Sequence, residues 1–267
     1  MYKEHWKINF DPFKEKITAK NSFESNDFVQ AQARFEYLKQ NPSLAVLTGQ
    51  PGSGKTHSLR CFVSTLPKNL FKVVYIPLST VTVLDFYKSI AYGLGTEVSS
   101  KKVTLFRSIQ ERIISLSKDK KVVPVIIIDE AQYLKTEVLN DIKLLLNFSM
   151  DSKNYALMIL AGQEPLGSTL NKSIHESLKQ RIAINFNYSG IDQNEVPEYI
   201  NTRIKLCGGS IELFDDNALE SIKSCCEGSF RVLNNLLSKS LMIGAQKQAS
   251  CINTDIVMMA QNEVELA

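Results

Sequence analysis

Residues 44–60 read LAVLTGQPGSGKTHSLR, an apolar run followed by a glycine-rich turn and a stretch compatible with a helix. The turn, GQPGSGKT at residues 49–56, satisfies the pattern GxxxxGK[ST] in the strand-before, helix-after context that this pattern requires. Glycines let successive backbone N–H groups turn inward around phosphate oxygens, and the start of the following helix adds partial positive charge. The stretch therefore predicts a phosphate-binding loop. The alternative is a glycine turn that only links a strand to a helix.

The loop also carries the side chains that a nucleotide site needs. Lys55 is placed to reach the β- and γ-phosphates, and the hydroxyl of Thr56 is placed to take one coordination position on Mg²⁺. The expected nucleotide-binding residues of this stretch are Gly49, Gln50, Pro51, Gly52, Ser53, Gly54, Lys55, Thr56 and His57.

A second apolar run, residues 125–128, ends in Asp129 and Glu130 about 75 residues downstream of the loop. At the end of a buried strand, Asp129 is placed to hold the Mg²⁺ shell and Glu130 to polarise an attacking water. Taken alone, two acids after an apolar strand indicate a solvated strand end. Together with the glycine loop they predict a site that both binds and hydrolyses a nucleotide.

Short apolar runs recur between stretches of helical spacing, as expected of buried parallel strands that alternate with helices. Amphipathic helices are indicated by apolar residues three and four positions apart, for example at residues 106–116 and 139–146. The pattern predicts an α/β fold with a five-stranded parallel sheet flanked by helices. The expected strands are residues 44–48, 73–76, 122–129, 157–161 and 182–186.

Beyond residue 189 the strand-like runs stop, and the pattern predicts a small all-helical lid domain with helices at 195–206, 216–225, 229–246 and 254–265. Asp215 or Asp216 and Thr254 are the expected helix caps. We therefore expect an N-terminal arm at residues 1–25 lying on the domain surface, an α/β ATPase domain at 26–188 and a helical lid domain at 189–267.

Composition restricts the class of protein only loosely. The 267 residues are 44% hydrophobic and 22% charged with a formal net charge of +3, which neither requires nor excludes nucleic acid. No run approaches the length of a membrane helix, and the N-terminus is too polar for a signal peptide, so a cytoplasmic protein without a membrane partner is expected. The five cysteines form no CxxC pair and predict buried thiols, with a redox role of Cys225 and Cys226 as the alternative.

These motifs resemble the AAA+ ATPases, with a Walker A loop, a Walker B acid pair and a helical lid. More closely, the chain resembles the ExeA/GspA-like ATPases and the transposase-partner ATPases of TniB, TnsC and MuB type. The stretches that carry the resemblance are YKEHWKINFDPF (2–13), LAVLTGQPGSGKT (44–56), VIIIDEAQYL (125–134), LLLNFSMDS (144–152), LMILAGQEPL (157–166), LKQRI (178–182) and GSFR (228–231).

The resemblance implies three further site residues. Gln163, after the fourth strand, matches sensor 1, which touches the γ-phosphate or the attacking water. Arg181 matches an arginine finger that a neighbouring subunit presents to ATP, and thus implies a homo-oligomer, a ring or a filament; a surface arginine is the alternative. Arg231 matches sensor 2, which couples the phosphate state to the lid. The resemblance also favours ATP over GTP, with ATP and Mg²⁺ as cofactors.

Residues 101–121 contain seven basic and two acidic residues. Repeated around an oligomer, such a segment would form a basic track for double-stranded DNA without strong sequence preference, although a solvated helix face explains the charges equally well. The basic residues are Lys101, Lys102, Arg107, Arg112, Lys118, Lys120 and Lys121.

Two functions follow from the resemblance. One is an ATP-dependent DNA-binding ATPase that regulates DNA transposition by recruiting or activating a DDE transposase. The other is an ATPase of a secretion or cell-envelope pathway, whose members carry a membrane span and a cell-wall-binding part after the ATPase. The chain shows neither part, and this favours transposition. A nucleotide-binding scaffold that rarely hydrolyses is a third possibility, which Glu130 argues against.

Overall fold

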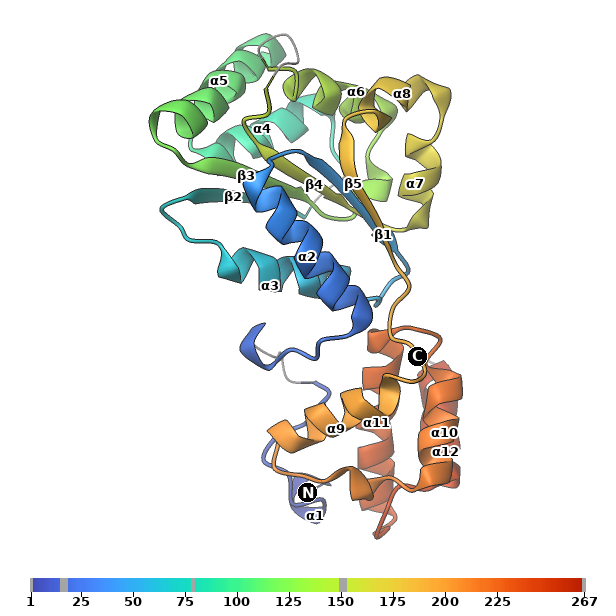
Figure 1. Ribbon diagram of the computed structural model, residues 1–267. Coiled ribbons are helices and arrows are strands. Elements are labelled where there is room, and N and C mark those ends of the chain that lie inside the picture. The colour runs from blue at the N-terminus through green and yellow to red at the C-terminus, as the bar shows by residue number, and fades with distance from the viewer. Residues whose placement is uncertain (1, 15–18, 78–79, 149–152, 266–267) are drawn as a thin grey trace. The chain divides into compact units, whose positions relative to one another are not determined.

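The computed structural model describes residues 2–14, 19–77, 80–148 and 153–265 (Figure 1). Its contacts divide the chain into two compact units. The sheet unit comprises Gln30–Gly49 and Lys55–Tyr188, and the helical unit comprises Met1–Val29, Gln50–Gly54 and Ser189–Ala267. Residues 149–152, which end the LLLNFSMDS stretch of the family resemblance, lie outside the described residues.

The sheet unit is built on five strands that pair in parallel in the order β2-β3-β4-β1-β5. The strands are β1 (Leu44–Gly49), β2 (Phe71–Ile76), β3 (Val123–Ile128), β4 (Leu157–Ala161) and β5 (Ile182–Tyr188). This confirms the predicted five-stranded parallel sheet. Because parallel strands end at the same edge, the residues that follow β1, β3 and β4 are brought to one edge of the sheet.

Alternate residues of the central strands face opposite sides of the sheet, and each side is covered by helices. On one face, Val46, Ile126 and Met158 pack against buried residues of α4, α5 and α6. On the other face, Ala45 and Ile127 pack in a core that α2 and α3 complete, as Figure 1 shows. The continuous apolar runs of the strands follow from this burial on both sides.

The helices of the sheet unit alternate with the strands along the chain. The longer ones are α2 (Asn26–Gln40), whose first residues belong to the helical unit, α3 (Lys55–Thr65), α4 (Val83–Leu94), α5 (Lys102–Ile114) and α6 (Thr136–Leu145). The shorter ones are a π-helical turn η2 (Ser115–Asp119), η3 (Ala131–Tyr133), α7 (Glu164–Leu170), η5 (Ser173–His175) and α8 (Glu176–Lys179).

The helical unit packs its helices around a separate apolar core. Its helices are α1 (Tyr2–His5), η1 (Ala19–Asn21), α9 (Val196–Leu206), η6 (Ile211–Leu213), α10 (Asp216–Cys225), α11 (Phe230–Gln246) and α12 (Thr254–Glu265).

The N-terminal residues belong to this core, so the expectation of an arm lying on the surface is wrong in this respect. Trp6, Ile8 and Phe13 are buried in the core, and the indole Nε1 of Trp6 donates a hydrogen bond to the carbonyl oxygen of Leu241 at 2.7 Å. Aromatic and aliphatic side chains as large as these are more stable in the core than exposed to water.

Of the expected helix caps, Asp215 agrees with the structure and Thr254 does not. Asp215 caps α10 by accepting from the backbone N of Ala218 at 2.6 Å, and Ser229 caps α11. Thr254 is instead the first residue of α12, and the side chain of Asn253 accepts from Ile256 N at 3.1 Å. Asn253 is therefore the N-cap of α12 in place of the expected Thr254, and Asn is as good an N-cap as Asp.

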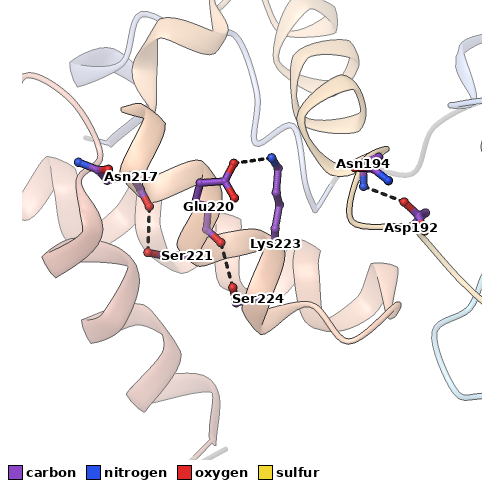
Figure 2. A network of polar contacts seen from close by, with 7 residues as sticks. All are labelled: Asp192, Asn194, Asn217, Glu220, Ser221, Lys223 and Ser224. Atoms are coloured by element: carbon purple, nitrogen blue, oxygen red, sulfur yellow. Dashed lines mark hydrogen bonds and ion pairs between the residues drawn. The ribbon is translucent and has the colours of Figure 1, made fainter.

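The surface of α10 carries a network of short-range polar contacts, which Figure 2 shows. The Nζ of Lys223 donates to the carboxylate of Glu220 at 2.6 Å, and Ser221 and Ser224 donate to backbone carbonyls four residues earlier. Each of these three contacts lies within one turn of the same helix.

No helix in the described ranges is both long and apolar enough to cross a membrane. All five cysteines lie within these ranges, and none of them forms a disulfide; Cys61, Cys207 and Cys226 are buried, whereas Cys225 and Cys251 are half-buried.

Candidate functional site at the strand ends

The phosphate-binding loop begins where β1 ends and continues directly into α3. Gly49 is the last residue of β1 and Lys55 the first of α3. Lys55 is only 9% exposed, and its Nζ donates a hydrogen bond to the carbonyl oxygen of Gly49 at 2.7 Å. The lysine ammonium is thereby held at the mouth of the loop, beside the start of a helix where the backbone also favours an anion.

Asp129 follows β3, is 6% exposed, and accepts hydrogen bonds from Thr56, Tyr75 and the backbone of Glu130. Its Oδ2 accepts from the Oγ1 of Thr56 at 3.2 Å and from the hydroxyl of Tyr75 at 2.8 Å. Its Oδ1 accepts from the backbone N of Glu130 at 3.0 Å. The structure thus brings together Thr56 and Asp129, the two residues expected to hold a metal ion.

Thr56 and Asp129 suit Mg²⁺ by their chemistry. Hydroxyl and carboxylate oxygens are hard donors, and Mg²⁺ is normally held by one or two protein oxygens together with water and phosphate oxygens. The Oγ1 of Thr56 and the Oδ2 of Asp129 lie 3.2 Å apart, close enough for one ion to be held by both. A Mg²⁺ ion held there would neutralise negative charge on the phosphates.

Tyr75 is a site residue that the sequence does not predict. It lies on β2, next to β3 in the sheet, in register with Ile127. Burial of its hydroxyl, followed by the hydrogen bond to Asp129, raises the pKa of Tyr75 to about 12. The hydroxyl therefore stays protonated at neutral pH and donates to the Asp129 carboxylate. Only the pairing of β2 with β3 identifies this contact.

Glu130 has a left-handed backbone conformation, with φ 54° and ψ 36°. For a residue with a Cβ this conformation costs about 1 kcal/mol or more, and such strain clusters at functional sites. The Glu130 side chain is exposed, and its Oε2 accepts a hydrogen bond from the Nε2 of Gln132 at 2.6 Å.

Gln132 has a second contact, because its Oε1 accepts from the backbone N of Gln163 at 3.0 Å. Gln163 lies two residues after β4 and precedes α7. The structure therefore links Glu130 and Gln163, two predicted catalytic residues, through Gln132. We call these two groups of contacts together the strand-end network; its members are Thr56, Tyr75, Asp129, Glu130, Gln132 and Gln163.

Arg181 and His57 also lie in the sheet unit. Arg181 lies between α8 and β5 and is half-buried, and its Nη1 donates to the carbonyl oxygen of Leu146 at 3.5 Å. His57 lies on α3 with its Nε2 at 3.6 Å from the Sγ of Cys61.

In the helical unit, loop residues Gln50–Gly54 lie against the start of α11. The backbone N of Phe230 donates to the carbonyl oxygen of Gly52 at 3.0 Å, and the Oγ of Ser229 donates to that of Pro51 at 3.3 Å. Gly52 has φ +84°, and a Cβ on it would overlap Ser229 and lie 3.0 Å from the Cβ of Arg231. Only glycine can both adopt this positive φ and leave room for Ser229 and Arg231. The loop and the start of α11 are therefore matched in shape.

Arg231 is exposed and is the second residue of α11. A cation at the start of a helix is opposed by the helix dipole, so its position beside the loop is better explained by an anionic ligand than by helix stability.

The parallel sheet in this strand order, with a glycine loop after β1 and acids after β3, defines a P-loop nucleotide-binding protein. Residues 38–170 match the family described as AAA domain. Residues 38–170 therefore form an AAA domain of P-loop type, a fold and family that imply nucleotide hydrolysis.

Two known proteins are similar to this chain over nearly its whole length. The chain is 26% identical over 265 residues to General secretion pathway protein A of Aeromonas hydrophila, covering 97% of this chain and 48% of that protein. It is 24% identical over 249 residues to ATP-dependent target DNA activator B of Escherichia phage D108, covering 91% of this chain and 73% of that protein. These relatives confirm the resemblance to both groups. The chain spans about half the length of the secretion protein.

The fold matches that of Cdc6p from Pyrobaculum aerophilum with a TM-score of 0.73 and 16% identity, over 96% of this chain and 72% of that one. At this identity the likeness shows the fold alone, and it agrees with the predicted sheet and helical part.

Proposed function

We propose that the protein is an ATP-dependent DNA-binding AAA+ ATPase that regulates DNA transposition, assembling on DNA and recruiting or activating a DDE transposase. The observation that carries the ATPase part is the strand-end network, which gathers the expected metal ligands and the expected catalytic acid at one edge of the sheet. The similarity to an ATP-dependent target DNA activator supports the part that concerns DNA.

In the proposed reaction, the ammonium of Lys55 binds the β- and γ-phosphates, and the residues from Gly49 to His57 surround the nucleotide. The carboxylate of Glu130 takes a proton from a water whose oxygen forms a bond to the γ-phosphorus. The bond from that phosphorus to the bridging oxygen breaks, and ADP leaves with the electron pair. Gln163 orients the water or the γ-phosphate, and Arg231 contacts the phosphates. Thr56 and Asp129 would hold the Mg²⁺.

The contacts of the basic segment at residues 101–121 narrow the set of residues proposed to bind DNA. Three basic side chains already have partners: Lys102 pairs with Asp141 at 2.7 Å, Arg112 donates to the carbonyl oxygen of Leu94 at 3.3 Å, and Lys118 lies over the ring of Tyr155. The exposed remainder, proposed to contact DNA phosphates, is Lys101, Arg107, Lys120 and Lys121.

A salt titration tests this part of the proposal. Each lost phosphate contact should reduce the slope of log affinity against log salt by about 0.9 for duplex DNA. The double variant Arg107→Ala/Lys120→Ala should lower the slope by up to about 2 per subunit. The matched control Lys68→Ala/Lys72→Ala removes the same charge from exposed positions elsewhere in the sheet unit. Equal slopes for the two double variants would reject the basic segment as the DNA site.

Arg181 is proposed to act as an arginine finger in a homo-oligomer. In comparable systems such a residue accelerates phosphoryl transfer by roughly 10³ to 10⁵. Arg181→Ala and Glu130→Gln should each be inactive alone, yet a mixture should regain activity, because one subunit supplies the intact arginine and its neighbour the intact glutamate. A mixture as inactive as its components would exclude a shared site.

The similarity to General secretion pathway protein A, which covers 97% of this chain, favours a second candidate function, an ATPase of a secretion or cell-envelope pathway. Electron microscopy with ATP or a slowly hydrolysed analogue, with and without duplex DNA, distinguishes the two. Nucleotide-dependent rings or filaments that form on DNA support transposition. Assembly that is the same with and without DNA supports the function in a secretion or cell-envelope pathway.

A further inference from the structure

Gln132 contacts two predicted catalytic residues at once, although no motif assigns it a role. Its amide nitrogen donates to the carboxylate of Glu130 at 2.6 Å, and its amide oxygen accepts from the backbone N of Gln163 at 3.0 Å. Both ends of one side chain are therefore engaged, one with the acid that follows β3 and the other with the segment that follows β4.

The Glu130 carboxylate needs such a partner. The side chain is exposed and starts from a left-handed backbone, so packing does not select one of its rotamers. A general base has to lie within hydrogen-bond reach of the proton that it removes, and a small displacement of the reacting groups lowers the rate strongly. The contact with Gln132 restricts where the carboxylate can lie.

The position of Gln132 is itself closely defined by the end of β4. A Cβ on Gly162 would lie 2.7 Å from the Oε1 of Gln132 and 3.0 Å from its backbone N. Any other residue at position 162 would therefore displace the amide. Gly162 lets the two chain segments approach closely enough for Gln163 N to reach the Gln132 side chain.

We propose that Gln132 is a positioning residue that holds the Glu130 carboxylate for catalysis and fixes it relative to the segment carrying Gln163. This role rests on the proposed ATP hydrolysis. Gln132 binds neither the nucleotide nor the metal ion; it acts through Glu130.

The direct test compares Gln132→Met with the wild type in two backgrounds. Met has a similar length but cannot donate to Glu130, so kcat should fall about tenfold. The Kd for a slowly hydrolysed ATP analogue should change less than twofold. In a Glu130→Asp background the shorter acid no longer reaches Gln132, so the same substitution should cost less than about twofold in kcat. Non-additivity of this kind shows that one residue acts through the other.

Two more variants keep the proposal testable if Gln132→Met folds poorly. Gly162→Ala displaces Gln132 without removing a polar group and should lower kcat in the same way. Gln40→Met makes the same exchange at an exposed position at the end of α2 and should match the wild type. Thermal unfolding of each variant separates loss of fold from loss of positioning.

An equal loss of kcat in both backgrounds, or no loss for either Gln132→Met or Gly162→Ala, would overturn the positioning role while leaving the proposed ATPase intact. Absence of hydrolysis in the wild type would instead overturn the proposed function, and this role with it. The role is supported if Gln132→Met lowers kcat in the wild-type protein but not in the Glu130→Asp variant, with the Kd for the analogue unchanged.

Discussion

The strand-end network and the contacts on α10 are both polar, but they differ in the origin of their members. The strand-end network joins residues from four chain segments, for example Thr56 with Asp129 and Gln132 with Gln163. On α10 the contacts of Lys223, Ser221 and Ser224 each lie within one helical turn (Figure 2). Local exposed pairs contribute little to stability, whereas contacts between distant segments require the whole fold. Contacts between distant segments, inside the site or outside it, should therefore be more sensitive to substitution than contacts within one helical turn.

The largest loss of stability is expected where three distant segments of the helical unit converge. Gly190 has φ +90°, its N donates to the Oδ2 of Asp27 at 2.8 Å, and a Cβ on it would overlap the carbonyl oxygen of Gly228. Gly190→Ala should lower the free energy of unfolding by about 3 kcal/mol, from backbone strain and overlap combined. Denaturant titration measures this value.

Gly95→Ala is the control, because Gly95 has a similar φ of +74° but no heavy atom within 4 Å of its added Cβ. It should cost only about 1 kcal/mol. Equal losses of unfolding free energy in Gly190→Ala and Gly95→Ala would show that the close approach of the three segments at Gly190 adds nothing to the cost.

A somewhat smaller effect is expected on nucleotide binding. Lys55→Ala removes a charged donor from the loop and should weaken ATP binding by about 2 kcal/mol, or roughly 30-fold, which a fluorescent-nucleotide titration measures. The exposed Lys68, changed to Ala, should leave the affinity unaltered. Unchanged affinity in Lys55→Ala would contradict the assignment of the loop.

Tyr87 tests a convergent contact that lies outside the site. Its hydroxyl donates to the Oδ1 of Asp141 at 3.1 Å, and Lys102 pairs with the same carboxylate at 2.7 Å. Tyr87→Phe should cost about 1–2 kcal/mol in the free energy of unfolding, because the buried carboxylate loses a donor.

The same contact predicts a pH dependence. Burial, followed by the charge of Asp141 and its hydrogen bond, raises the pKa of Tyr87 above its ordinary 10.0. The protonated form is thus favoured in the folded state. Its stabilisation is complete below pH 10 and is lost as pH rises above 10 toward the raised pKa. Tyr87→Phe should therefore lose less stability than the wild type above pH 10, and identical alkaline losses would show that Tyr87 does not titrate with a raised pKa.

The smallest effect is expected on α10. Lys223→Ala breaks the contact with Glu220, whose side chain is 71% exposed, and should change the free energy of unfolding by less than about 0.5 kcal/mol. A loss above 1 kcal/mol in denaturant titration would show that local contacts here matter as much as convergent ones.

The fold was largely predictable because burial on both faces of a parallel sheet leaves apolar runs in the sequence, such as residues 125–128. The start of the loop after β1 and the acids after β3 were predicted in the same way. The burial of Trp6 was missed, since an aromatic residue in a polar N-terminus carries no local sign of the core that it joins.

Tyr75 and Gln132 were missed as site residues for a different reason. Their contacts depend on β2 pairing with β3 and β3 pairing with β4, and strand order is not encoded in the periodicity of any single segment. The left-handed conformation of Glu130 is likewise a property of the folded turn. The catalytic roles of Glu130, Gln163, Arg181 and Arg231 stay predictions.

The most direct test of the proposed ATPase compares turnover of ATP by the wild type and by Glu130→Gln, with Mg²⁺ and saturating duplex DNA, alongside the Kd for a slowly hydrolysed analogue. Losing a general base lowers a rate by about 10² to 10⁴. The wild type should therefore turn over at least about 100-fold faster, with analogue binding equal in the two proteins. Equal rates, or no hydrolysis by the wild type, would contradict the account.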